Sequence, residues 1–324
     1  MRITMIFIFS MAVLAAGAQK KAKQTETFYD HEWNVCDAGE ASFYALKIQT
    51  DSGWHRQDYF AHGNIMQMNG TYDDSACTIK NGWFYFFYPN TKAKDYGVYK
   101  HGKKQGVWLS FYPTGVMSDS ITYDNDNKVG ISISWYADGV QKDSSNFQQN
   151  GGGVTIWWFD NGNPMAAGRY VNWKAQGKWQ FFHSNGKMSA LETYNDGNLT
   201  DKKYFDENGT SMDTTSNDRS ATFPGGGKAW SKYLSGELFV PARYRITNSH
   251  NAVMSITFTI DEDGKIQDAY VSTTFHPDYD KIALDAIKKS PAWLPAVRHN
   301  RRMRDVRTQT ITFGQGQEYE YFNG

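Results

Sequence analysis

A repeat of 23 to 24 residues runs through the middle of the chain and constrains its fold more than any other feature. Each copy has an aromatic pair, a short polar stretch and a glycine, as in Trp135-Tyr136-Ala137-Asp138-Gly139. Looser copies surround Phe60 and Tyr88. The constant period predicts stacked units of one kind. Five copies end in the glycines 115, 139, 162, 186 and 209.

Each copy has the pattern of a β-hairpin. Aromatic pairs favour strands, and the Asp-Gly or Asn-Gly that follows suits the positive φ of a tight turn. One hairpin is marginally stable alone, so neighbouring hairpins must pair to bury their aromatic side chains. We therefore expect a mainly β repeat sheet over residues 55–210, with the five glycines at equivalent turns. Residues 19–54 are expected to form a lead-in that caps the open edge of this sheet.

Two copies carry a fuller motif, G-x-W-x-x-[FY]-[FY]. They are Gly106-Val107-Trp108-Leu109-Ser110-Phe111-Tyr112 and Gly177-Lys178-Trp179-Gln180-Phe181-Phe182. This pattern resembles the bacterial form of the MORN-type repeat (membrane occupation and recognition nexus). The resemblance implies a stack of β-hairpins. Members of this family are often labelled antitoxins, so a repeat-based antitoxin or inhibitor is one functional alternative.

The first 18 residues have the pattern of a secretory signal peptide. An apolar run from Ile3 to Ala16 ends in the small residues Ala16-Gly17-Ala18, which a signal peptidase accepts. Export would place the chain in an oxidising compartment, where Cys36 and Cys77 could form a disulfide. Sequence cannot supply the separation of the two thiols. A disulfide and two free cysteines therefore both stay open.

Composition changes after Gly209. Residues 211–222 are polar and free of aromatic residues, which is typical of a linker. Beyond them the pattern predicts a small α+β domain of order α-β-β-α-β with a three-stranded sheet, followed by a tail at 316–324. In the first strand, Ser255, Thr257 and Thr259 alternate with apolar neighbours. The expected elements are a helix opening at 223–226, strands at 252–260 and 265–273, a helix at 279–290 and a strand at 304–313.

The motifs of this domain resemble the C-terminal domain of TonB over about residues 223–315. They include Phe223-Pro224-Gly225-Gly226, the segment from Phe258 to Ile266, and Ser290-Pro291-Ala292-Trp293-Leu294-Pro295. The resemblance implies a periplasmic protein of a Gram-negative bacterium that contacts a short segment of an outer-membrane transporter. In that family, the contact is strand addition at the edge of the small sheet, where main-chain groups are open to an extended peptide.

The last strand is therefore the predicted binding site for a transporter peptide. Several arginines crowd its start, and they could guide an acidic peptide or simply form a solvated surface. The predicted binding residues are Arg302, Arg304, Val306, Arg307, Thr308, Gln309 and Thr310.

Other function classes lack support in the sequence. The 34 basic and 34 acidic residues balance, which argues against a nucleic-acid partner. No catalytic, cofactor-binding or metal-binding motif is found, so we expect a non-enzymatic interaction protein without a cofactor or metal. Its partner would be an outer-membrane transporter peptide or another periplasmic protein.

A second interpretation is a TonB-type energy transducer that keeps its N-terminal helix as a membrane anchor. Inner-membrane proton-channel proteins would be partners only in that anchored form. Whether the chain forms a homodimer is open at this stage.

Overall fold

The computed structural model describes residues 24–215, 217–239 and 251–314. Within these ranges the chain forms a 17-stranded sheet, a three-stranded sheet, a two-stranded hairpin and two α-helices. The prediction of a mainly β chain with a long sheet of stacked hairpins is confirmed. The predicted signal peptide (1–18) and tail (316–324) lie outside the described residues and stay predictions.

The long sheet follows the order of the chain. Each strand pairs antiparallel with its neighbours in sequence, except that β10 pairs with β8 and not with β9. The sheet already begins at Gln24, because the predicted lead-in supplies β1 and β2. Its strands are β1 (Gln24–Tyr29), β2 (Phe43–Thr50), β3 (Gly53–Phe60), β4 (Ile65–Tyr72), β5 (Lys80–Phe87), β6 (Ala93–Lys100), β7 (Lys103–Phe111), β8 (Met117–Asp124), β9 (Asn127–Lys128), β10 (Gly130–Trp135), β11 (Gln141–Phe147), β12 (Gly153–Trp158), β13 (Pro164–Val171), β14 (Lys174–Phe182), β15 (Met188–Asn195), β16 (Asn198–Phe205) and β17 (Ser211–Met212).

The five repeat glycines occupy equivalent turns of this sheet, as expected. Their φ angles all lie between +81° and +89°. At Gly139 the backbone N–H donates to the carbonyl of Tyr136 at 2.9 Å, and the N–H of Tyr136 donates to Val140 at 2.8 Å. The left-handed conformation is what a three-residue hairpin loop requires of its last residue.

The second aromatic residue of a repeat pair also joins its unit to the next. The hydroxyl of Tyr112 donates to the carbonyl of Trp135 at 2.8 Å, and Tyr136 donates to Trp158 at 2.8 Å. Burial raises the pKa of Tyr112 to about 12, so this hydroxyl keeps its proton at neutral pH. The stacking of units therefore rests on side-chain hydrogen bonds as well as on strand pairing.

A second set of glycines makes room for tryptophan rings on the sheet. A Cβ at Gly97 would overlap the ring of Trp108, and a Cβ at Gly168 would overlap the ring of Trp179. Both tryptophans are buried and form the centres of small aromatic clusters. Gly97 and Gly168 therefore mark places where a ring lies against the backbone of the sheet.

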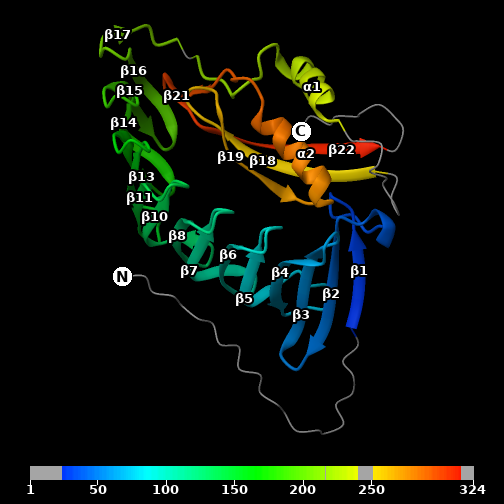
Figure 1. The fold of residues 1–324 in the computed structure, drawn as a ribbon. Helices are drawn as coiled ribbons and strands as arrows, with labels where there is room; N and C mark the ends of the chain where they lie inside the picture. Colours follow the sequence, from blue (N-terminus) through cyan, green and yellow to red (C-terminus); the bar gives the residue numbers. More distant parts are fainter. Residues whose placement is uncertain (1–23, 216, 240–250, 315–324) are drawn as a thin grey trace, which may run out of the picture.

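The C-terminal elements form a small sheet of order β19-β18-β22 with two helices. Along β18, Ile256 and Phe258 point into the core beneath the helices, whereas Thr257 and Thr259 lie on the other face. This sheet lies on the concave side of the long sheet (Figure 1). The elements are α1 (Gly226–Glu237), β18 (Asn251–Ile260), β19 (Ile266–Thr273), α2 (Pro277–Lys288), β20 (Ala296–Arg298), β21 (Arg301–Met303) and β22 (Asp305–Gly314).

The segment predicted as a linker, 211–222, is partly built into the fold. Its first residues form β17, and Arg219 and Thr222 pair with Val297 and Leu294 through backbone bonds of 2.9 Å. Main-chain pairing does not depend on side-chain polarity, so composition alone gave no sign of it.

The choice left open for the two cysteines is settled by the structure. Cys36 and Cys77 are both free thiols, with Cys77 buried and Cys36 partly exposed.

Candidate functional site

Strand β22 lies at one edge of the small sheet. It pairs along its whole length with β18, from Asp305 opposite Ile260 to Gly314 opposite Asn251. No other described strand pairs with it. In an antiparallel strand the main-chain groups alternate between its two sides, so half of those in β22 are outside the ladder. This edge contains most of the predicted binding residues.

The side chains of these residues divide between the two faces of the small sheet. Thr308 and Thr310 share hydrogen bonds of 2.9 and 3.1 Å with Thr257 and Ser255 on β18. Gln309 lies on the helix side, where it accepts a 2.7 Å hydrogen bond from the indole of Trp230. The strand therefore presents a polar face and a helix-packed face, as its alternation requires.

Two residues of the predicted set are exposed. Val306 is 65 % exposed, and Arg302 on β21 is also exposed. Their positions leave them open to a partner that approaches the start of β22.

The other predicted arginines make contacts within the chain. Arg304 forms an ion pair with Asp160 of the long sheet and lies 3.2 Å from Glu262, with its guanidinium 4.7 Å from the centre of the Tyr136 ring. Arg307 donates to the carbonyl of Ala221 at 2.9 Å. These charges are already paired, so an electrostatic guide for an acidic peptide would depend on Arg302.

The hairpin of β20 and β21 inserts its tip into the long sheet. His299 stacks on Phe181 with ring centres 3.8 Å apart, and its Nδ1 lies 3.0 Å from the carboxylate of Glu192. The guanidinium of Arg301, which is 3 % exposed, donates to the carbonyl of Met165 at 2.7 Å. We call the hairpin of β20 and β21 the docking hairpin.

A second contact joins the small sheet to the N-terminal half of the long sheet. The rings of His62 and Phe275 lie 4.2 Å apart between their centres, and those of Tyr88 and Tyr270 lie 5.4 Å apart. The small sheet is thus held at both ends.

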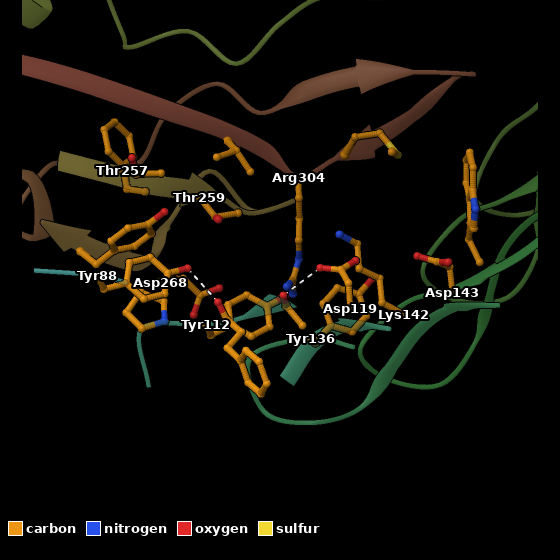
Figure 2. Close-up of a pocket in the computed structure, with 18 of the residues that line it drawn as sticks. Tyr88, Tyr112, Asp119, Tyr136, Lys142, Asp143, Thr257, Thr259, Asp268 and Arg304 are labelled. Atoms are coloured by element: carbon orange, nitrogen blue, oxygen red, sulfur yellow. Dashed lines mark hydrogen bonds between the residues drawn. The ribbon is translucent and has the colours of Figure 1, made fainter. Parts of the chain in front are cut away.

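A cavity of about 520 Å³ lies between these two contacts. Figure 2 shows Thr257 and Thr259 of the small sheet and Arg304, which precedes β22, opposite Tyr136 and Asp119 of the long sheet. The polar face of β18 therefore lines this cavity.

Three aspartates form a row across the concave face of the long sheet, through the floor of the cavity. Asp95, Asp119 and Asp143 stand 24 residues apart in sequence, on β6, β8 and β11. Between them in register, Ser110 donates to Asp95 at 2.6 Å and Ser134 donates to Asp119 at 2.7 Å. We call these five residues the Asp-Ser row.

The electrostatics of the row come from burial and hydrogen bonding. Burial raises the pKa of Asp143. Successive aspartates lie two strands apart, about 10 Å across the sheet. Among the described residues, no group of three or more His, Cys, Asp or Glu side chains is placed to hold a metal ion.

Sequence reasoning missed the Asp-Ser row, although a signal was present. The repeat was aligned on its aromatics and glycines, and the polar positions inside each unit were not compared. Asp95, Asp119 and Asp143 recur with the period of the repeat, as do Ser110 and Ser134. Comparing every position of successive units would have predicted the row.

Within the described ranges, neither helix has the length and apolar character needed to cross a membrane.

Comparison with known protein families supports the assignment of a repeat in two segments of the chain. No curated protein matches the chain. No family matches residues 223–315, so the similarity of that region to TonB stays a prediction. Residues 104–125 and 175–196 match the MORN repeat variant family, and these segments hold the hairpins β7–β8 and β14–β15 with Trp108 and Trp179. At these two places, therefore, the chain carries MORN-variant repeats.

Proposed function

We propose that this chain is a non-enzymatic periplasmic interaction protein that captures an extended peptide at the free edge of β22. The peptide would come from an outer-membrane transporter or from another periplasmic protein. The observation that carries the proposal is the one-sided pairing of β22, because an unpaired strand edge can accept a further strand.

A small cavity beside this edge supports the proposal. It has a volume of about 200 Å³ and is lined by Phe223, Trp230, Arg307 and Gln309, among others. Peptides bound by strand addition obtain specificity from pockets that receive alternate side chains. An apolar side chain of the incoming peptide would fit between the aromatic rings.

In this proposal the long sheet is a scaffold. Its curvature and the docking hairpin hold the small sheet in place, while β22 stays at the edge of the small sheet. The periplasmic location rests on residues 1–18, and the N-terminal residue of protein recovered from the periplasm would test it. A start near Gln19 is expected, whereas an intact Met1 in membrane-bound protein would favour the anchored energy transducer.

Proline substitutions in the full mature chain test the capture of a peptide. Proline removes a main-chain donor, and Thr308→Pro and Gln309→Pro remove donors on opposite sides of β22. We expect at least one variant to lose binding to a periplasmic transporter segment, measured by fluorescence anisotropy with a synthetic peptide. The matched variants Thr308→Ala and Gln309→Ala keep the donors and should bind within a few-fold of wild type.

Hydrogen exchange covers the case in which the proline variants fail to fold. Adding the same peptide to the wild-type chain should slow exchange at alternate amides of β22, because strand addition protects the outward-facing N–H groups. Unchanged exchange along β22 with saturating peptide would overturn the proposal. So would normal binding by both folded proline variants.

A further inference from the structure

The cavity that contains Asp119 and Asp143 of the Asp-Ser row continues into a second one of about 500 Å³. Both are lined by Asp119, Lys142, Asp143 and Trp157, so they form one groove. The groove begins between the two sheets and continues over the concave face of the long sheet alone. Each is within the size range of sites that bind small organic molecules. We call the pair the intersheet groove.

The floor of the groove is polar, whereas the positions directly next to it in the same row of the sheet are aromatic. The row continues to Phe86 beyond Asp95 on one side and to Trp157 beyond Asp143 on the other. Burying carboxylates where aromatic side chains would pack is unfavourable for folding. Violations of this kind are expected at functional sites.

A buried hydroxyl in the groove has no hydrogen-bond partner. Ser132 is 4 % exposed, lines the second cavity, and its Oγ makes no hydrogen bond. The neighbouring hydroxyls of Ser145 and Thr155 are paired with each other at 2.7 Å. A buried hydroxyl without a partner costs free energy, which a ligand hydroxyl could recover.

The walls of the groove combine aromatic rings with balanced charge. Tyr112 and Tyr136 line one end, and Trp157, Tyr170 and Trp173 line the other. The groove is bordered by three acidic and three basic side chains, so neither a strongly cationic nor a strongly anionic ligand is favoured. The charged residues are Asp119, Asp143, Asp268, Lys128, Lys142 and Arg304.

We propose that the intersheet groove binds a neutral oligosaccharide. Sugar rings have apolar C–H faces that suit the electron-rich faces of aromatic rings, and hydroxyl edges that donate to carboxylates and exchange hydrogen bonds with serines. Asp119 and Asp143 accept hydrogen bonds from the sugar, and Ser132 acquires its missing partner. This site is separate from the edge of β22 and does not depend on peptide capture there.

An array of immobilised neutral and charged oligosaccharides, probed with the full mature chain, tests this proposal. We expect binding to neutral glycans. The strongest of them is then titrated in solution by tryptophan fluorescence, because Trp157 and Trp173 line the groove. Asp119→Asn and Asp143→Asn should each weaken binding about tenfold or more, as expected for loss of a hydrogen bond to a charged group.

Asp95→Asn is the matched control. Asp95 belongs to the same Asp-Ser row but does not line either cavity, so its variant should bind the glycan as wild type does. Thermal melting of all three variants separates loss of binding from loss of folding.

The proposal is overturned if the array shows no binding to neutral glycans, or if Asp95→Asn loses binding as strongly as the other two. Tight binding of a trilysine peptide that Asp119→Asn abolishes would also overturn it, because the groove would then be a cation site.

Discussion

At the scale of single residues, two kinds of glycine stabilise the long sheet for different reasons. Gly139 has a φ of +89°, and no heavy atom lies within 4 Å of the place where a Cβ would stand. The constraint there is purely conformational. At Gly97 the obstacle is the ring of Trp108, which occupies the space of the missing side chain.

We expect Gly139→Val to lower the free energy of unfolding by about 1–2 kcal/mol, because a β-branched residue is strained at positive φ. Gly139→Asn should cost clearly less, since asparagine tolerates the left-handed region. Urea unfolding of the two variants measures the difference. Equal stability of wild type and Gly139→Val would show that the turn is not under this constraint.

The turn glycines could be predicted because the requirement for positive φ is local and leaves a mark in the sequence. The role of Arg304 could not be predicted in the same way. Its partner Asp160 lies 144 residues away, and nothing in either neighbourhood encodes which surface the other will meet. The prediction of a free edge at β22 rested on the expected strand order and on a resemblance. The intersheet groove could not be predicted, because its residues come together only when both sheets are placed.

At the scale of elements, the docking hairpin is held by a buried carboxylate, that of Glu192. Burial alone would raise the pKa of Glu192, but hydrogen bonds from His299 and Tyr194 outweigh it and hold that pKa below its ordinary value. The carboxylate is 2 % exposed, so solvent screens this contact little. The ionised form of Glu192 therefore stabilises the docked hairpin.

Because the pKa of Glu192 is lower in the folded state, its contribution is present above the unfolded pKa and is lost as pH falls through the folded value. Glu192→Gln should thus reduce stability at pH 7 by about 1–3 kcal/mol, the usual cost of losing hydrogen bonds to a buried charge. The difference from wild type should shrink below about pH 4.

Urea unfolding at several pH values tests this, with the exposed Glu207→Gln as the control. A difference between wild type and Glu192→Gln that stays constant down to acid pH would contradict the assignment.

At the scale of the whole molecule, contacts at two places hold the described parts of the two sheets together. Arg301 and Arg304 reach the long sheet from the docking hairpin and the residue that follows it, while ring pairs secure the other end of the small sheet. Interfaces of this kind within one chain set how independently the two parts unfold.

Replacing both arginines, as Arg301→Met with Arg304→Ala, should uncouple the two sheets. We expect calorimetry to show two separate unfolding transitions where the wild type shows one, and small-angle scattering to show a larger radius of gyration. Arg302→Ala on the same hairpin is the matched control, because that side chain is exposed. A single, unshifted transition in the double variant would mean that the arginines do not couple the sheets.

The neighbour-to-neighbour pairing of the long sheet has a consequence for how the chain acquires its structure. Every contact between successive hairpins joins residues close in sequence, so the sheet can zip up rapidly from one end while the polypeptide is still being synthesised. The docking of His299 against Glu192 spans 107 residues and must come last. A ribosome-bound intermediate ending near residue 212 would therefore already contain the curved surface on which the remainder of the protein closes.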